Sequence, residues 1–303
     1  MTVPDIGWRL SVVVTSLGDA ASLRGALAAL AAQTGVDPFE IVIPANARVS
    51  ALLGELLPLP LNARVVATSA SADTWEMRGA GVRASTAPVV ATIEDAAVPD
   101  PAWARRLLES HAASHGAIGG TVAKGVPDSA PGWAMYFLDY ARYIPPVAAG
   151  PTSYLSACNV SYKRTALDRV ASSWSREMHE TDVHWALQRS GETLWIDPGM
   201  VVRFRRPLSL GAACAELRAH GRKFARGRGM HTSAVARTLR AATTPLLPLL
   251  VLGRTARVAS RSPGVAVRWA WSLPAMVPMA MAWAWGEFEG YAGATVQGQA
   301  TGA

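Results

Sequence analysis

Cysteine and charge are both scarce in this chain. Of its 303 residues, two are cysteines, Cys158 and Cys214, and 17% are charged, while half are apolar. Two isolated cysteines do not make a disulfide framework or a metal cluster, so we expect both to be small core side chains in a reducing compartment. The low share of charge argues against a disordered chain and allows a large buried core.

A cleaved leader and a long apolar run are also lacking. The first residues, MTVPDIGWRL, contain no charged segment followed by an apolar stretch, so we expect no signal peptide and a cytoplasmic first domain. Two apolar runs, at 244–253 and 269–285, are shorter than the roughly 20 residues that cross a bilayer as a helix. Pro274 and Pro278 interrupt the second run, which favours a hairpin or an interfacial helix anchored by its tryptophans. The alternative is a Trp-rich helix packed inside the protein.

Acidic residues are nearly absent from 201 to 268, where fourteen Arg and Lys stand against Glu216 alone. Such a block is typical of binding either to nucleic acid or to an anionic lipid surface. No zinc-finger spacing and no aromatic-glycine RNA motif accompanies the block, and the apolar runs lie beside it. We therefore predict that the region 244–285 attaches the chain, peripherally or integrally, to the cytoplasmic face of an anionic membrane. We expect no nucleic-acid partner.

The first 125 residues alternate β-rich runs with helical patterns. The alternation predicts right-handed crossovers and a mostly parallel, Rossmann-like α/β sheet flanked by helices. The expected strands lie at 10–15, 39–43, 63–68, 88–93 and 118–122, and the expected helices include 73–85, 103–115, 133–143 and 181–189. Ligands of such sheets bind beyond the carboxyl ends of the strands. That rule directs attention to Thr15, Ser16, Asn46, Glu94 and Asp95.

Two groups of carboxylates carry the chemistry that the sequence suggests. Glu94 and Asp95 end a buried strand, where they are costly unless they face water or a cation, and Mg²⁺ and Mn²⁺ prefer oxygen ligands of this kind. Glu180 and Asp182 open a helix, where the exposed N–H groups favour carboxylates. Each group also has a purely structural interpretation, as a solvated strand end and as a helix cap.

Two other patterns are discounted. His111 and His115 share a helix face but have no third ligand nearby in sequence, so we expect a solvated helix edge and not a zinc site. Asn159-Val160-Ser161 fits a glycosylation acceptor, which a cytoplasmic domain would not present to the glycosylation machinery.

Several segments, in order, resemble the family 2 glycosyltransferases, which have the GT-A fold. They are VVVTSLGDAASLRGALAALAAQT, MRGAGVRASTAPVVATIEDAAVPDPAW, LSACNVSYKRTAL and HETDVHWALQRSGETLWIDPGMVV, followed by GRKFARGRG and WAWGEFEGYAG, which are similar to one membrane-linked branch. The resemblance covers residues 10–293. It implies an inverting transferase that moves a sugar from a nucleotide-diphospho-sugar to an acceptor hydroxyl, in polysaccharide or glycolipid synthesis.

The resemblance also implies a domain organisation. A GT-A catalytic domain would occupy residues 1–230, with a nucleotide-sugar half at 1–125 and an acceptor half at 126–230. A basic and apolar helical region at 231–293 would associate with the membrane, and 294–303 would form a disordered tail.

Carried over residue by residue, the resemblance assigns Glu180 as the catalytic base that removes the acceptor proton, with Asp182 beside it. Glu94 and Asp95 would hold a divalent metal, Mg²⁺ or Mn²⁺, at the diphosphate. The remaining positions line the site: Thr15, Ser16, Asn46, Arg78, Glu94, Arg222, Arg226 and Arg228 toward the nucleotide-sugar, and Trp103 and Asn159 toward the acceptor.

Three positions depart from the family's pattern. Ala96 stands where a further metal ligand is usual, Pro44-Ala45 follow the second strand in place of an Asp, and Glu180 replaces an Asp. The first alternative is therefore a catalytically degraded relative that only binds a nucleotide or acts as a scaffold at the membrane. The second alternative is a basic nucleic-acid-binding protein.

Overall fold

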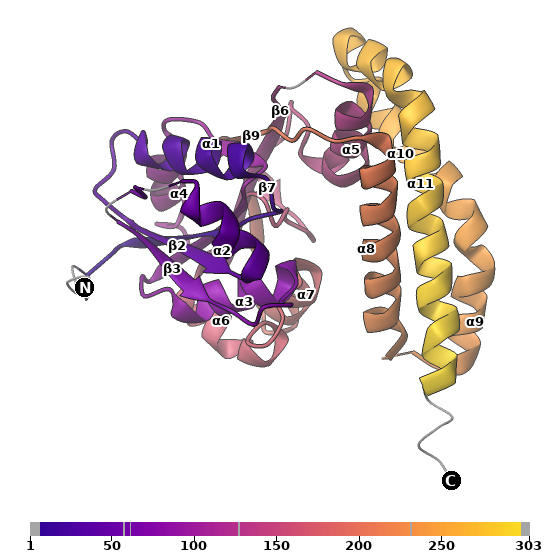
Figure 1. The fold of residues 1–303 in the computed structure, drawn as a ribbon, viewed down its shortest axis with the longest axis horizontal. Helices are drawn as coiled ribbons and strands as arrows, with labels where there is room; N and C mark the ends of the chain where they lie inside the picture. The colour runs from indigo at the N-terminus through magenta and orange to yellow at the C-terminus, as the bar shows by residue number, and fades with distance from the viewer. Residues whose placement is uncertain (1–6, 57, 61, 127, 231, 298–303) are drawn as a thin grey trace. The chain divides into compact units, whose positions relative to one another are not determined.

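The computed structural model describes residues 7–56, 58–60, 62–126, 128–230 and 232–297. The chain divides into two compact units (Figure 1). We call Met1–Gly125 with Tyr143–Arg205 the sheet unit, and Val126–Arg142 with Arg206–Ala303 the helical unit. This division differs from the expected boundary at residue 230, because two segments before that boundary belong with the C-terminal helices.

Within the described residues, one mixed sheet of nine strands forms the centre of the sheet unit, in the order β3-β2-β1-β4-β8-β6-β9-β5, with β7 paired to β9. The pairs β1–β2, β1–β4, β2–β3 and β6–β9 are parallel and the others are antiparallel. The strands are β1 (Leu10–Thr15), β2 (Glu40–Ala45), β3 (Ala63–Ala67), β4 (Val89–Glu94), β5 (Ala97–Pro99), β6 (Ala117–Lys124), β7 (Gly150–Pro151), β8 (Val160–Lys163) and β9 (Leu194–Phe204). The predicted mostly parallel α/β sheet is confirmed at this level.

Helices flank both faces of the sheet, with α1 and α4 on one side and α3 and α6 on the other (Figure 1). Their bounds are α1 (Ala20–Ala31), α2 (Ala47–Gly54), α3 (Thr74–Ala84), α4 (Trp103–Ser110), α6 (Arg164–Arg169) and α7 (Glu180–Arg189), with 3₁₀ turns η1 (Ala141–Tyr143) and η2 (Ala171–Ser173). The predicted strands and helices are present, with ends that differ by a few residues from the expected ones.

Local sequence explains the elements that carry the candidate site. All six residues of β1 are buried, as expected for a central parallel strand that is covered on both faces. Helix α3 begins with a capping box, in which the Asp73 side chain accepts from the Glu76 amide and the Glu76 side chain accepts from the Asp73 amide. The box satisfies N–H groups that the first turn of a helix leaves open. It therefore fixes where α3, and the side chains on it, begin.

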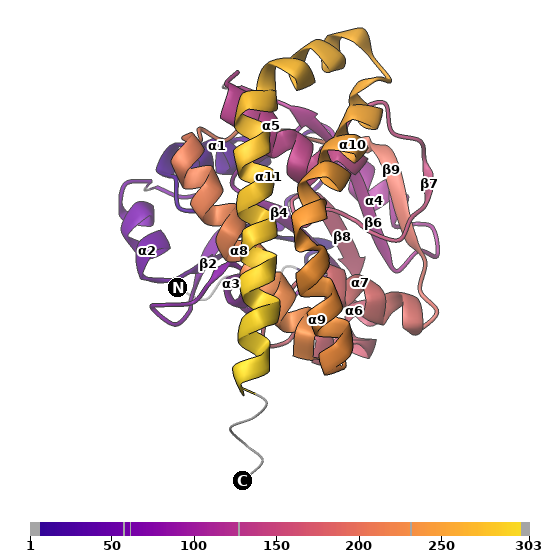
Figure 2. The same ribbon diagram turned by 90° about the vertical axis from the view of Figure 1, so that its right-hand side faces the viewer.

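The helical unit comprises α5 (Ala130–Tyr140), α8 (Leu210–Met230), α9 (Ala234–Thr243), η3 (Thr244–Leu246), α10 (Leu247–Ala259) and α11 (Pro263–Gln297). Helix α11 runs beside α8, α5 and α10 (Figures 1 and 2). Glycines allow the closest approach: a Cβ on Gly286 would collide with the Arg218 carbonyl, and a Cβ on Gly221 would meet the Trp283 carbonyl oxygen at 2.5 Å. Only a residue without a side chain fits at either point.

Two predictions for the C-terminal region are corrected. Residues 269–285 do not form a hairpin, because α11 continues without a break through Pro274 and Pro278. The helix also runs on to Gln297, into the segment expected to be a disordered tail, and residues 298–303 lie outside the described part of the chain. Each proline lacks the backbone N–H that an interior helical residue donates, and the packing of α11 on α8 and α5 offsets this cost.

Among the described residues, one helical segment, Ala234–Ala259, is long and apolar enough to cross a membrane, since its most apolar 18-residue window has a mean hydropathy of 1.2. It contains the first of the two predicted apolar runs but not the second. Its most apolar window is only 6% buried within the protein, so this segment is unlike a core helix. Length and composition thus give limited support to membrane association, and they do not indicate which side of a membrane the chain occupies.

Candidate active site

The carboxyl ends of β1 and β4 meet, as the parallel arrangement predicts. Thr15 and Glu94 are register partners at the end of the ladder, and the Asp95 amide donates to the Thr15 carbonyl over 3.1 Å. Thr15 is completely buried, and its Oγ1 has no hydrogen-bond partner among the residues that the structure describes. The ends of β1 and β4, to which the sequence directed attention, therefore lie together at the carboxyl edge of the sheet.

Asp95 stabilises the turn that leads from β1 into α1. Its side chain is 1% exposed, and its Oδ2 accepts from the Ser16 hydroxyl over 2.6 Å and from the Leu17 amide over 2.9 Å. The Ser16 hydroxyl in turn accepts from the Gly18 amide. Charge-assisted bonds to a buried carboxylate are among the stronger hydrogen bonds in proteins. Asp95 and Ser16 are therefore part of the framework under the site, whereas the sequence predicted direct ligand contacts for both.

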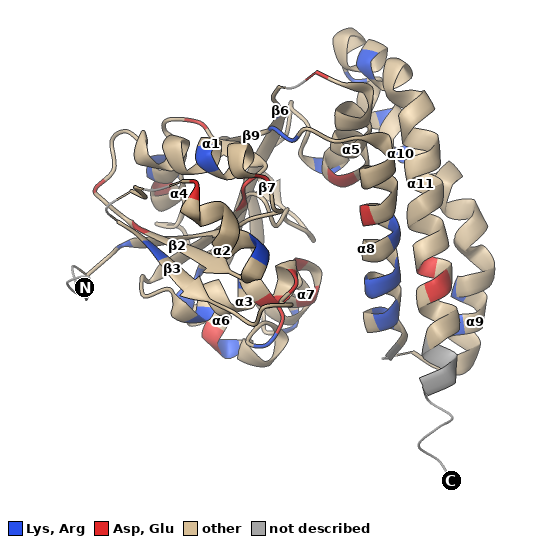
Figure 3. Ribbon diagram, viewed as in Figure 1, with Lys and Arg blue, Asp and Glu red and all other residues tan. Residues whose placement is uncertain are grey.

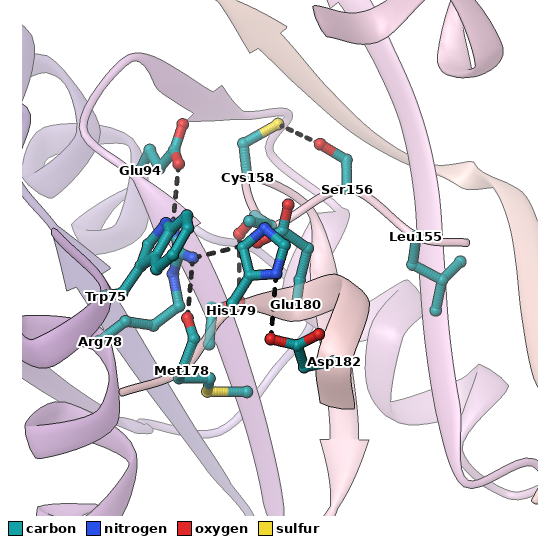
Figure 4. A network of polar contacts seen from close by, with 12 residues as sticks. Trp75, Arg78, Glu94, Leu155, Ser156, Cys158, Met178, His179, Glu180 and Asp182 are labelled. Atoms are coloured by element: carbon teal, nitrogen blue, oxygen red, sulfur yellow. Dashed lines mark hydrogen bonds and ion pairs between the residues drawn. The ribbon is translucent and has the colours of Figure 1, made fainter. Parts of the chain in front are cut away.

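Arg78 joins the two predicted groups of carboxylates (Figure 4). Its guanidinium, on α3, lies 2.9 Å from Glu94 Oε1 and 3.4 Å from Glu180 Oε2, and it also donates to the Met178 carbonyl over 3.3 Å. The Arg78 side chain is 2% exposed, but Glu94 and Glu180 retain 15% and 26% exposure. The two carboxylates, far apart in sequence, thus converge on one buried cation and still reach solvent.

His179 lies beside Glu180 at the start of α7. Its Nδ1 lies 3.5 Å from Asp182 Oδ2, and its ring is 4.2 Å from that of Trp75, measured between centroids. Burial lowers the pKa of His179, but Glu180 and Asp182 outweigh that effect, and the net pKa lies above the ordinary value. His179 is therefore biased toward its charged form next to Glu180.

Glu180 is biased toward its ionised form. Burial by itself raises the pKa of this carboxyl, but the charges of His179 and Arg78 exceed that contribution, and the net pKa lies below the ordinary value. The carboxylate also sits in the first turn of α7, where the helix N-terminus favours negative charge. Near neutral pH, Glu180 is thus an anionic, partly exposed group with the capacity to accept a proton.

A neutral histidine supports α7 from inside. His184 is completely buried, its Nδ1 accepts from the Leu155 amide over 3.4 Å, and its Nε2 lies 3.1 Å from the Tyr162 hydroxyl. Burial, the largest effect, lowers the pKa of His184 to about 4. Because Nδ1 accepts, Nε2 carries the proton and donates to Tyr162. This contact ties α7 to β8 and so fixes the helix that presents Glu180.

The residues expected to hold a divalent metal do not fit one. Glu94 is paired with Arg78, Asp95 accepts two hydrogen bonds from protein donors, and Ala96, 1% exposed, has no oxygen on its side chain. A hard cation such as Mg²⁺ needs several oxygen ligands around it. Over the described ranges, no group of three or more His, Cys, Asp or Glu side chains is placed to hold a metal ion.

The two residues predicted on the acceptor side are buried in the core. Trp103 is 1% exposed and Asn159 is completely buried. The Trp103 indole N–H donates to Asn159 Oδ1 over 2.9 Å, and Asn159 Nδ2 donates to the carbonyls of Thr121 and Met200 over 3.0 and 2.8 Å. Every polar atom of the Asn159 side chain is therefore used inside the protein, and the predicted acceptor contact is corrected.

The other predicted positions are distributed over both units. Asn46 caps α2 through the Val49 amide and donates to the Ala72 carbonyl over 2.8 Å, so both ends of its side chain are engaged in the framework. The three arginines predicted on the nucleotide-sugar side belong to α8 in the helical unit, a helix along which several basic residues recur (Figure 3). Their proposed role stays a prediction; they are Arg222, Arg226 and Arg228.

His111 corrects another expectation. It is 8% exposed and not at a solvated helix edge, and its Nε2 lies 2.8 Å from the Ser161 hydroxyl, which donates to the Ile118 carbonyl. Burial lowers its pKa to about 4. His115 stacks on Trp195 at 4.5 Å between ring centroids. Both histidines therefore serve packing.

Sequence reasoning missed Trp75 and His179 as members of the site. A signal for each was present: Trp75 precedes Arg78 by three positions on the same helix, so the two share a face, and His179 directly precedes Glu180.

A surface depression of about 670 Å³, lined by Arg9, Asp37 and Arg105 among others, does not include the carboxylates described above.

Comparison with known proteins adds no assignment. No protein-family model matches the chain, and no curated protein matches it.

Proposed function

We propose that the chain is an inverting glycosyltransferase of the family 2, GT-A type that moves a sugar from a nucleotide-diphospho-sugar to an acceptor hydroxyl, in polysaccharide or glycolipid synthesis. One observation carries the proposal: Glu94 at the end of β4 and Glu180 at the start of α7 converge on Arg78. The resemblance predicted that these two carboxylates face one site. A mostly parallel sheet with Glu94 at the carboxyl end of β4 supports the same interpretation.

In this proposal Glu180 is the general base. Its lowered pKa keeps it ionised near neutral pH, and its 26% exposure leaves room for an acceptor hydroxyl to approach. It takes the hydroxyl proton while the oxygen attacks the anomeric carbon of the donor, and the nucleotide diphosphate leaves from the opposite face, which inverts the configuration. Arg78 holds Glu180 and Glu94 at fixed positions around the reacting groups.

The proposed place of work is the cytoplasmic surface of an anionic membrane. The segment Ala234–Ala259 carries solvent-exposed apolar side chains, among them Val235, Leu239, Leu249 and Leu250, each more than 60% exposed. The region 231–293 also contains six arginines and, before residue 287, no acidic residue. Apolar side chains next to basic ones bind anionic lipid through burial and charge together. An acceptor linked to lipid would meet the enzyme there.

Turnover of a panel of nucleotide sugars tests the proposal. We expect at least one donor to be hydrolysed or transferred, and Glu180→Gln to lower kcat by about 10²–10⁴-fold, the usual contribution of a general base. Asp168→Asn is the matched control, because this carboxylate is exposed on α6. Absence of turnover together with absence of any nucleotide-induced thermal shift would contradict the proposal.

A nucleotide-binding protein without catalytic activity is the second candidate. The observation that favours it is the position of Ala96, buried at 1% exposure, where a metal ligand is usual in the family that the sequence resembles. This candidate predicts that a nucleotide raises the melting temperature although no donor is turned over. A ligand at a hundred times its Kd stabilises the folded state by about 2.7 kcal/mol, which a thermal-shift assay detects.

A further inference from the structure

We propose that the Arg78 guanidinium permanently occupies the place of a bridging cation between Glu94 and Glu180, so that this site works without a divalent metal. The inference rests on the proposed function in taking Glu94 and Glu180 as the donor-side and base carboxylates. It goes beyond that function in naming the positive charge that the reaction uses.

The geometry supplies the first argument. One guanidinium reaches both carboxylates, at 2.9 and 3.4 Å, through two different nitrogens. A third contact, from Arg78 Nη1 to the Met178 carbonyl, holds the group from the side of the loop before α7. An arginine keeps its charge throughout the working pH range of proteins. The cation is therefore built in and cannot be removed by a chelator.

Burial supplies the second argument. Arg78 is 2% exposed, and its Nε has no hydrogen-bond partner among the described residues. A charge held in the interior is expensive to separate from its counter-ions. Glu94 and Glu180 are those counter-ions, so moving Arg78 aside to admit a dication would leave a buried guanidinium without them.

The remaining donor set supplies the third argument. Asp95 Oδ2 is engaged by Ser16 and Leu17, and the Ala96 side chain provides no oxygen. His179, whose pKa is raised by Glu180 and Asp182 against the effect of burial, is biased toward its charged form beside Glu180. A dication approaching these carboxylates would meet the permanent charge of Arg78 and too few ligands.

Manganese binding to the purified full-length protein, measured by electron paramagnetic resonance without any substrate, tests the inference. We expect the wild type to bind Mn²⁺ no more tightly than about millimolar. Arg78→Gln removes the guanidinium charge, and we expect it to bind Mn²⁺ at least tenfold more tightly, a gain that Glu94→Gln in the same chain abolishes. Arg78→Lys retains a positive charge and is the matched control, with the weak binding of the wild type.

The inference is overturned if the wild type binds Mn²⁺ with micromolar affinity and Glu94→Gln abolishes that binding. This comparison does not depend on whether any Arg78 variant folds. Circular dichroism establishes whether each variant is folded. If a donor nucleotide is bound, its binding is expected to be unchanged by EDTA. Mn²⁺ binding is measured without turnover, so the two proposals can fail separately. A protein that transfers no sugar and binds no Mn²⁺ contradicts the proposed function but not this inference.

Discussion

A substitution at Asn159 tests whether this residue belongs to the core or contacts a ligand. The sequence predicted that it faces the acceptor, whereas the structure buries it completely with three side-chain hydrogen bonds. Asn159→Ala leaves the Trp103 indole N–H and the carbonyls of Thr121 and Met200 without this partner. A buried polar group left unsatisfied costs about 1–3 kcal/mol. Because the three neighbouring groups can relax together, their costs do not simply add. We predict that the substitution lowers the free energy of unfolding by about 3–5 kcal/mol.

Two measurements report this loss. For a domain of 150–250 residues, about 3 kcal/mol lowers Tm by about 6–12 °C, which circular dichroism resolves. Because the sheet and helical units can unfold separately, a probe inside the sheet unit is also needed. Cys158, 1% exposed, provides one: in a Cys214→Ser background, its rate of reaction with a thiol reagent reports opening around it. About 3 kcal/mol corresponds to a more than roughly 100-fold larger population of the open state, and to a correspondingly faster reaction of Cys158.

Gln188→Ala is the matched control, because it also removes an amide that donates to a carbonyl, but on the exposed side of α7. We expect its effect to stay within about 0.5 kcal/mol. Should Asn159→Ala melt like this control and protect Cys158 equally well, while the KM for an acceptor rises, the burial argument is refuted and Asn159 is an acceptor contact.

Three further predictions follow from charge and packing. His179→Gln should destabilise the protein more near pH 6 than near pH 9, as measured by urea denaturation. The reason is that the pKa of His179 is raised in the folded state, which stabilises the fold below the unfolded pKa of about 6.5. This contribution is lost as the pH rises through the folded pKa. Gly120→Ala should cost about 1–3 kcal/mol, because its Cβ would collide with the Met200 carbonyl, whereas Gly54→Ala, with open space around it, should be neutral or slightly stabilising by the same thermal assay. Asp95→Asn should weaken the bonds to Ser16 and Leu17 by about 1–3 kcal/mol and, in a thermal-shift titration, weaken nucleotide binding without abolishing it.

The part of the site that the sequence predicted depends on local patterns. A buried run such as β1, followed by a capped helix, has few alternatives to a parallel strand and crossover. The carboxyl ends of β1 and β4 must then meet, which brings Thr15 and Glu94 together whatever the loops do. Family resemblance, and not periodicity, led us to expect Glu94 and Glu180 in one site, and the structure shows both in contact with Arg78.

The parts that failed depend on distant partners. Whether Asn159 faces a ligand or the core is decided by the chain segments around Thr121 and Met200, about forty residues away on either side, and no local pattern records that proximity. The unit boundary failed for a similar reason. Helix α5 follows β6 in the chain but packs with α11, which begins more than a hundred residues later. A prediction from the sequence alone assigns such a segment to the same unit as its neighbours in the chain.

The predicted metal and the observed guanidinium are two answers to the same electrostatic requirement. Two carboxylates that lie close together, one at the end of β4 and one at the start of α7, need a positive charge between them, and a sequence motif records the carboxylates without recording which cation they face. Arg78 is sixteen residues before Glu94 on a different element, so only the packing of α3 against β1 and β2 decides that it reaches the pair. The buried Ala96 fits this arrangement: one guanidinium already faces two carboxylates, so a third acidic side chain would add further uncompensated negative charge, which a small apolar side chain avoids. We therefore expect an acidic side chain introduced at position 96 to create Mn²⁺ binding only when Arg78 is also replaced.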